Sequence, residues 1–284
     1  MVVHELLEDL AVEPSGGDGY RGAVPRRNLP RMFGGQILGQ ALMAAAATCE
    51  PERPPHSLHC SFLRPGDPAV PVDFAVVRLR ESRAFSTRRV DALQRGALIA
   101  TAVVSFHVRE VSLGYRRATS DDPLGPEALP TLAERLTAAG GSVPAWWSDP
   151  LPFDIRFLRE PAALMGATAY PDARQQYWVR TIEALPAQPE VHAAVLAYAS
   201  DLNLLDAALL PDGASWYGDR RVFGASIDHA MWFHGDLRAD NWLLCTQSTE
   251  IVHRARALCE ARYRELGGEL VASAVQEGLV RRPE

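Results

Sequence analysis

The stretch that decides the fold is GALIATAV at residues 96–103, because a close copy of it, GELVASAV, stands at residues 268–275. Both copies begin with glycine and continue with small, β-branched and apolar residues, a composition that favours a strand. The two copies are 172 positions apart in a chain of 284 residues. A recurrence on this scale indicates that one half of the chain repeats the other.

Two further matches lie upstream, in the same order in both halves. At an offset of 169, Ser57 and Gly66-Asp67 match Ser226 and Gly235-Asp236. At an offset of 165, Gln36 is set opposite Asp201. Three ordered matches with a slowly drifting offset are what a duplicated domain leaves behind. The sequence therefore predicts two similar units in tandem.

Each half contains one helix-like run followed by strand-like segments. Residues 36–48 are rich in Ala and Leu and contain no Pro, which predicts a buried helix, and residues 191–210 are its counterpart. The strand-like segments are residues 72–79, 97–108, 241–248 and 270–280. Residues 254–263 are ambiguous, because their propensity favours a helix. Their repeat partner, FSTRRVDALQ, has the character of a strand, so we predict a strand there.

The region between the halves carries clusters of Pro and Gly, which are typical of a linker. We expect an N-terminal unit at residues 1–110 and a linker at 111–153 with one short helix around Leu132 to Ala138. A C-terminal unit would follow at 154–284. A long helix with several antiparallel strands, present twice, predicts sheets that wrap around central helices and cover each other's edges.

Composition limits the possible functions. Lys and Arg number 29 against 35 Asp and Glu, for a net charge of −6, which argues against non-specific binding of nucleic acid. No apolar run is long enough to suggest a membrane span. The first residues are acidic where a signal peptide is basic, and the last three are not a peroxisomal signal. Four scattered cysteines fit reduced thiols, so we expect a cytoplasmic protein.

Three polar residues stand out in apolar surroundings. Asp201 lies in one of the most apolar helical stretches, where a carboxylate is costly unless it is paired or used. A helix cap or a solvated position would also explain it. Gln276 interrupts an apolar strand, and its repeat partner is Val104; an outward-facing or edge position is the alternative. Ser226 alone could be a structural hydroxyl.

The chain resembles the acyl-CoA thioesterase II family, whose members are fused double hotdogs of the α+β class. The matching strings run in order along nearly the whole chain. They are FGGQ (33–36), GQAL (39–42), HSLH (56–59), FLRPGD (62–67), FS (85–86), RRV (88–90), YASDLN (198–203), IDH (227–229), MWFH (231–234) and VQEG (275–278). In a double hotdog, each unit wraps an antiparallel sheet around a central helix.

The resemblance implies a catalytic Asp, Thr and Gln that fall on Asp201, Ser226 and Gln276. Together they would orient one water for hydrolysis of a (fatty) acyl-CoA thioester, with the carboxylate as general base. Serine in place of threonine keeps the hydroxyl but loses the methyl group that stiffens χ1. Backbone N–H groups at the start of the hotdog helix are the expected oxyanion donors. The resemblance implies no metal or redox cofactor, and it implies a homo-oligomer.

Two other functions are open. An enoyl-CoA hydratase on the same fold would carry a His five positions after the Asp, where this chain has Asp206. A non-catalytic acyl-CoA-binding protein is the second alternative. In the first half, Gln36, Ser57 and Val104 stand opposite the catalytic trio. An amide and a methyl group cannot do the work of a carboxylate and an amide, so we expect a degenerate first site.

Overall fold

The computed structural model describes residues 1–26, 31–111, 113–115, 117, 123–138, 151–161, 164, 169–216 and 221–282. Part of the predicted linker, including residues 139–150, lies outside the described residues. Its short helix is present as α3 (Leu132–Ala138), as expected. Two short 3₁₀ helices, η1 (Pro126–Ala128) and η2 (Leu204–Leu209), also lie among the described residues.

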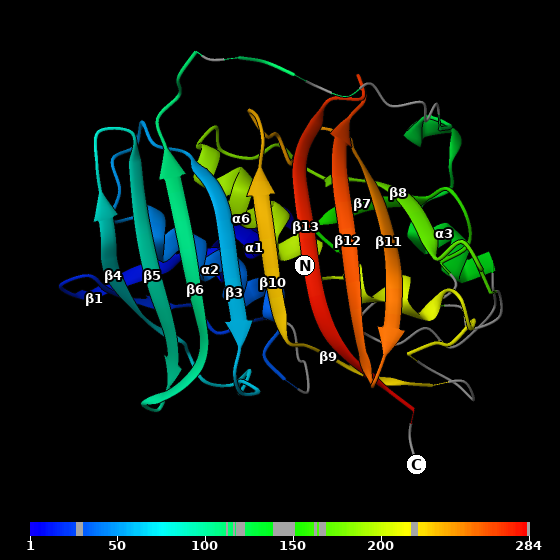
Figure 1. Ribbon diagram of the computed structural model, residues 1–284, viewed down its shortest axis with the longest axis horizontal. Helices are drawn as coiled ribbons and strands as arrows, with labels where there is room; N and C mark the ends of the chain where they lie inside the picture. Colours follow the sequence, from blue (N-terminus) through cyan, green and yellow to red (C-terminus); the bar gives the residue numbers. More distant parts are fainter. Residues whose placement is uncertain are drawn as a thin grey trace.

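Thirteen strands in the described part of the chain form one antiparallel sheet. The first half contributes β1 (Val12–Gly16), β2 (Gly19–Gly22), β3 (Pro55–Phe62), β4 (Asp73–Glu81), β5 (Phe85–Gln94) and β6 (Ala97–His107). The second half contributes β7 (Phe153–Phe157), β8 (Arg174–Thr181), β9 (Phe223–Ser226), β10 (Asp228–Phe233), β11 (Leu243–His253), β12 (Arg256–Glu265) and β13 (Leu270–Arg281). Their order is β1-β2-β4-β5-β6-β3-β10-β13-β12-β11-β8-β7, and β9 also pairs with β13. The halves therefore meet where β3 pairs with β10 (Figure 1).

The repeated glycines lie at equivalent turns. Gly96 and Gly268 precede β6 and β13, with φ angles of +78° and +81° that glycine adopts readily. Each turn closes a hairpin, β5–β6 in the first half and β12–β13 in the second. The ambiguous segment at residues 254–263 is largely strand β12, so the strand prediction is confirmed there.

Two central helices lie behind the curved sheet (Figure 1). They are α2 (Gly34–Ala46) and α6 (Pro189–Ser200), and nearly all of their side chains are buried. They pack antiparallel at short range. A Cβ atom on Gly35 would lie 2.5 Å from the Tyr198 carbonyl oxygen, and one on Gly39 would lie 3.2 Å from that of Ala194. The start of α2 is therefore held against the end of α6.

The predicted helix at residues 191–210 was wrong in its second part. Helix α6 ends at Ser200, and Asn203 has φ −152° and ψ 17°, outside the helical region. The Asn203 side-chain oxygen accepts hydrogen bonds from Tyr177 Oη (2.9 Å) and Gln247 Nε2 (3.0 Å). These buried bonds to β8 and β11 stabilise the break, after which η2 continues. The apolar sequence beyond Ser200 packs in the core without extending the helix.

Two of the predicted repeat pairings were also wrong. Gln36 lies in the first turn of α2, whereas Asp201 follows the last residue of α6, so they are not equivalent. On the strands, His59 lies opposite Val103, while Ala230 lies opposite Val275. With Val103 equivalent to Val275, this register makes Ser57 equivalent to Asp228 and not to Ser226. The pairing of Val104 with Gln276 agrees with both registers.

The first residues form elements that the sequence did not predict. Helix α1 (Val3–Leu10) packs its buried face on the central helices. The glycine-rich segment GDGYRG (17–22) forms the turn and second strand of the β1–β2 hairpin. This hairpin joins the sheet beside β4.

Candidate active site

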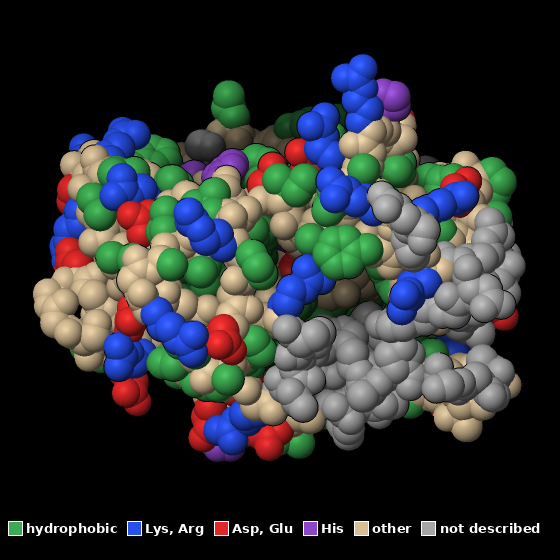
Figure 2. Space-filling view, turned by 90° about the horizontal axis from the view of Figure 1, so that it is seen from below, with side chains coloured by type: hydrophobic (Ala, Val, Ile, Leu, Met, Phe, Trp, Pro, Cys, Tyr) green, Lys and Arg blue, Asp and Glu red, His purple; other side chains and the backbone are tan. Residues whose placement is uncertain are grey.

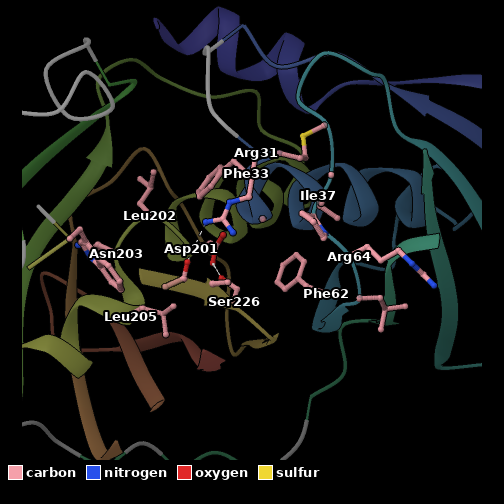
Figure 3. A pocket seen from close by; sticks show the side chains of 18 of the residues that line it. Arg31, Phe33, Ile37, Phe62, Arg64, Asp201, Leu202, Asn203, Leu205 and Ser226 are labelled. Atoms are coloured by element: carbon pink, nitrogen blue, oxygen red, sulfur yellow. Dashed lines mark hydrogen bonds between the residues drawn. The ribbon is translucent and has the colours of Figure 1, made fainter. Parts of the chain in front are cut away.

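The three residues singled out from the sequence meet in space. Ser226 Oγ donates a hydrogen bond to Asp201 Oδ1 (3.1 Å), and Gln276 Nε2 donates to the same oxygen (2.6 Å). Gln276 Nε2 also donates to Ser226 Oγ (2.6 Å). Figure 3 shows Asp201 and Ser226 together at the centre of a pocket. The hydroxyl and the amide therefore both converge on one carboxylate oxygen.

A different element of the second half positions each side chain. Asp201 directly follows α6, where helical geometry ends. Ser226 ends β9, which pairs with the last part of β13 so that Ser226 lies opposite Gly278. Gln276 is an inward-facing residue of β13 and is almost completely buried, which contradicts the outward-facing alternative. A helix end and two paired strands thus bring the polar groups together.

The first half contributes backbone to the same place, at the start of α2. We expected N–H groups at the start of a hotdog helix here, but the sequence identified no particular residues. The Gly35 N–H group, in the first turn of α2, donates a hydrogen bond to the Asp201 carboxylate. A Cβ atom on Gly34 would lie 2.5 Å from Asp201 Oδ2, so only glycine leaves room for the carboxylate. A helix N-terminus favours negative charge, and here it faces Asp201. The consecutive glycines in the sequence were the signal that could have revealed this contact.

Burial dominates the electrostatics of Asp201. Desolvation raises the pKa of its carboxyl group to about 6, although the hydrogen bonds from Gln276, Ser226 and Gly35 act to lower it. The residue is partly exposed through the pocket, while the surrounding protein disfavours the charged form. A carboxyl group with this pKa is ionised at pH 7 and is a stronger base than an ordinary aspartate, which suits general-base chemistry.

A buried histidine, His229, contacts the residue that precedes Asp201 and does not line the pocket. His229 Nε2 lies 2.9 Å from Ser200 Oγ, whose own hydroxyl donates to the Ala197 carbonyl (2.8 Å). Nε2 must therefore carry the proton in that bond. Burial lowers the pKa of His229 to about 4, so the ring is neutral. The neighbouring Asp228 accepts a hydrogen bond from the Glu277 N–H (3.0 Å). His229 and Asp228 therefore both make structural contacts.

Asp201 and Ser226 line a pocket of about 480 Å³, and Gln276 is hydrogen-bonded to both without lining it. Its walls are mostly apolar, with Phe33, Ile37 and Phe62 from the first half, and Leu202 and Leu205 from the second. Seen from below, the surface is hollowed near its centre, and Lys or Arg side chains border the hollow (Figure 2). Within the residues described, no group of His, Cys, Asp or Glu is suitable for holding a metal ion.

Comparison with known proteins identifies the family. A family model described as "Acyl-CoA thioesterase" matches residues 160–279, and one described as "Acyl-CoA thioesterase N-terminal domain" matches residues 25–107. The chain is 35% identical to acyl-coenzyme A thioesterase 8 of Mus musculus, an alignment that covers 96% of this chain and 87% of the relative. The chain belongs to the acyl-CoA thioesterase family.

Other known proteins are similar to this chain over nearly its whole length. The chain is 29% identical to acyl-CoA thioesterase 2 of Haemophilus influenzae, over 99% of this chain and 98% of that relative. Among solved structures, an acyl-CoA thioesterase II from Mycobacterium marinum superposes with a TM-score of 0.77 at 35% identity, covering 98% of both chains. A hotdog-fold protein from Alicyclobacillus acidocaldarius gives a TM-score of 0.81 at 20% identity and supports the fold alone. The α+β double-hotdog prediction is confirmed.

Proposed function

We propose that this acyl-CoA thioesterase family member hydrolyses the thioester bond of (fatty) acyl-CoA to the free acid and CoA, with Asp201, Ser226 and Gln276 as its catalytic groups. The observation that carries the proposal is the convergence of a hydroxyl and an amide on one carboxylate at the base of an apolar pocket. Family membership supports the choice of a thioester substrate.

In the proposed mechanism, the trio holds one water against the thioester carbonyl. Asp201 accepts a proton from this water as its oxygen attacks the carbonyl carbon, which is general-base catalysis worth about 10²–10⁴-fold. Ser226 and Gln276 fix the orientation of the water and of the carboxylate. The carbon–sulfur bond then breaks, and the departing thiolate takes up a proton as CoA leaves.

The negative charge that develops on the carbonyl oxygen needs hydrogen-bond donors. The start of α2 supports the assignment of this role to backbone N–H groups, since Gly34 lies close enough to Asp201 for substrate at the carboxylate to reach it. Donors that are already oriented stabilise such an oxyanion without reorganisation. The Gly35 N–H is engaged with the carboxylate, so Gly34 is the better candidate for this role.

The two alternative functions receive less support. A hydratase of the expected type needs a histidine five residues beyond the aspartate, and position 206 is an aspartate that donates nothing when ionised. A binding protein would not need an aspartate with a raised pKa beside a hydroxyl and an amide. Solved dehydratase domains at 14–15% identity show similarity of fold only.

Release of free thiol tests the proposal. The purified chain is incubated with acyl-CoA substrates of increasing chain length, and the thiol is detected with a thiol-reactive dye. We expect turnover that saturates with substrate and is lost in Asp201→Asn. Binding of acyl-CoA without thiol release would support the binding-protein alternative. Hydration of enoyl-CoA, measured by loss of its conjugated absorbance, would support the hydratase.

We also propose a division into units at 1–110 and 154–284 joined by a linker at 111–153, and a cytoplasmic homo-oligomer. Cys49, Cys60, Cys245 and Cys259 are free thiols, which fits a reducing compartment. No described helix is long and apolar enough to cross a membrane. At the two ends of the sheet order, β1 and β7 each pair with a single strand among the described residues. Such edges favour association with another copy.

A further inference from the structure

The mouth of the pocket carries two arginines that the proposed hydrolysis leaves unused. Arg31 precedes α2, and Arg64 follows β3 in the segment FLRPGD, so both come from the first half. Both side chains are exposed, and both residues line the pocket. Figure 3 shows Arg31 above Asp201, while Arg64 lies beyond Phe62 on the side away from Leu202 and Leu205.

Arg31 bridges the two halves at the pocket entrance. Its Nη2 donates a hydrogen bond to the Gly224 carbonyl (3.3 Å), and its guanidinium carbon lies 5.0 Å from the centre of the Phe223 ring. Both contacts are to β9, the strand that ends in Ser226. The carbonyl and the ring hold the guanidinium against β9 at the wall of the pocket. A guanidinium has five N–H donors, and this bond uses one of them.

Arg64 is held in a similar manner on the other side of Phe62. Its Nη1 donates to the Leu98 carbonyl (2.6 Å) at the start of β6, which leaves its remaining donors unassigned. Among the described residues, neither Arg31 nor Arg64 forms an ion pair with a carboxylate. Other exposed arginines of this acidic chain do form such pairs, for example Arg21 with Asp73 and Arg78 with Asp18.

We propose that Arg31 and Arg64 form a subsite for the phosphate groups of the CoA moiety. The planar guanidinium fork matches phosphate geometry. Arg64 lies beyond Phe62 from Leu202 and Leu205, which gives the substrate a direction along the pocket. The pantetheine arm then passes Phe62, and the acyl chain runs towards Leu202 and Leu205. This inference rests on the proposed function, because it assigns the orientation of the same substrate.

A comparison of substrates with and without phosphate tests the subsite. Arg31→Gln and Arg64→Gln are assayed with an acyl-CoA and with the same acyl group on N-acetylcysteamine, which has the thioester but no phosphate. Each substitution should raise KM for acyl-CoA about tenfold or more, the loss expected for a charged hydrogen bond. The value of kcat for acyl-CoA, and kcat/KM for the short thioester, should stay within about twofold.

Arg89→Gln is the matched control. Arg89 is an exposed arginine of β5 that pairs with Asp91 and does not line the pocket. This variant removes the same charge and should leave KM for both substrates unchanged. Acyl-dephospho-CoA and acyl-4′-phosphopantetheine then locate the contact. If loss of the 3′-phosphate alone reproduces the raised KM, the arginines bind that phosphate; otherwise they bind the diphosphate.

Two results would overturn the subsite. Equal losses on acyl-CoA and on the short thioester would show that the arginines act on the structure of the pocket, and an unchanged KM would show that they contact nothing. Failure of the proposed hydrolysis looks different, because the unsubstituted chain would then release thiol from neither substrate. In that case calorimetric binding of CoA itself to the parent and the two variants decides the subsite. Equal affinity would reject it.

Discussion

The two ends of the paired central helices contrast sharply. Where α6 ends against the start of α2, Asp201 meets Gln276, and Gln276 lies opposite Cys259 in the β12–β13 register. Where α2 ends, the equivalent register pair of β5 and β6 is Arg88 opposite Val104. One end of the helix pair thus presents an acceptor and an amide, and the other presents a cation and a methyl group.

The cation at the second end is buried and fully engaged in hydrogen bonds. Arg88 is 1% exposed and donates to Thr48 Oγ1 (2.8 Å), to the Thr48 carbonyl (3.1 Å) and to Glu81 Oε2 (2.6 Å). A guanidinium at the carbonyl end of a helix is electrostatically favourable. It cannot accept a proton, however, and its burial keeps it from solvent. The two ends therefore carry different chemistry on a similar frame, a carboxylate with its donors at one and a buried ion pair at the other.

Asp201→Asn should have the largest effect on the catalytic end, because it removes the proton acceptor there. The amide keeps the shape of the carboxylate but cannot take a proton, so kcat should fall about 10²-fold or more. Thiol release at saturating acyl-CoA measures the loss, and circular dichroism confirms that the variant is folded. A folded variant with activity within a few-fold of the parent would exclude Asp201 as the base.

Gly34→Ala tests whether the first half is part of the active site. The new Cβ atom would lie 2.5 Å from Asp201 Oδ2, so the carboxylate or the start of α2 must move. We expect kcat to fall about 10- to 100-fold, as displacements near 1 Å commonly cause. Gly114→Ala is the control, because a Cβ atom there meets nothing within 4 Å. Full activity in Gly34→Ala would show that all catalytic constraints come from the second half.

The pH dependence of activity should report Asp201. Because burial raises its pKa to about 6, kcat/KM should rise about tenfold per pH unit below pH 6 and level off above it. The effect on stability has the opposite sign. The native state binds this proton more tightly than the unfolded chain, so Asp201 lowers the free energy of unfolding as pH rises from about 4 to 6. An acid limb that persists unchanged in residual Asp201→Asn activity would belong to another group.

Gln276→Ala and Gln36→Ala compare a site amide with a buried amide of the first half. Loss of the Gln276 amide removes two hydrogen bonds at the trio, and kcat should fall about tenfold. Gln36 Nε2 donates to the carbonyls of Asp9 and Ala23, and none of these three residues lines the pocket. Its removal should cost about 1–3 kcal/mol of unfolding free energy with little change in kcat. A comparable loss of kcat in both variants would contradict the division of labour.

Ser226 substitutions should have the smallest effects. Ser226→Thr restores the residue typical of the family and should be neutral or slightly improve turnover. Ser226→Ala removes the hydroxyl that donates to Asp201 and should lower kcat by about five- to tenfold. Saturating rates for the three proteins decide the matter. If alanine is as active as serine, the hydroxyl does not position the water.

Much of the sheet was predictable from the sequence, because strand alternation is a local property. Short sequence patterns predict the glycine turns before β6 and β13 and the strand β12. The family resemblance adds the candidate site residues Asp201, Ser226 and Gln276. The end of α6 was not predictable in this way. Residues 202–210 are as apolar as the helix before them, and the break depends on buried hydrogen bonds from distant strands.

The asymmetry of the two sites was hidden for a related reason. Arg88 occurs in a strand-like run where an alternating charge normally faces solvent, yet it is buried against the end of α2. The contribution of Gly34 and Gly35 depends on how closely α2 and α6 pack, which no local pattern encodes. Counting offsets between repeats also misplaced Gln36 and Ser57, because insertions in loops shift sequence offsets without shifting strand register.

The junction between β3 and β10 has a consequence for synthesis of the chain. Strand β3 pairs with β6 on one side soon after both are made, but its other neighbour belongs to the second half. At about 5–20 residues per second, the ribosome needs on the order of ten seconds to deliver β10. During that interval the nascent chain carries an open strand edge in what becomes the middle of the sheet, where pairing with a neighbouring chain competes with completion of the fold.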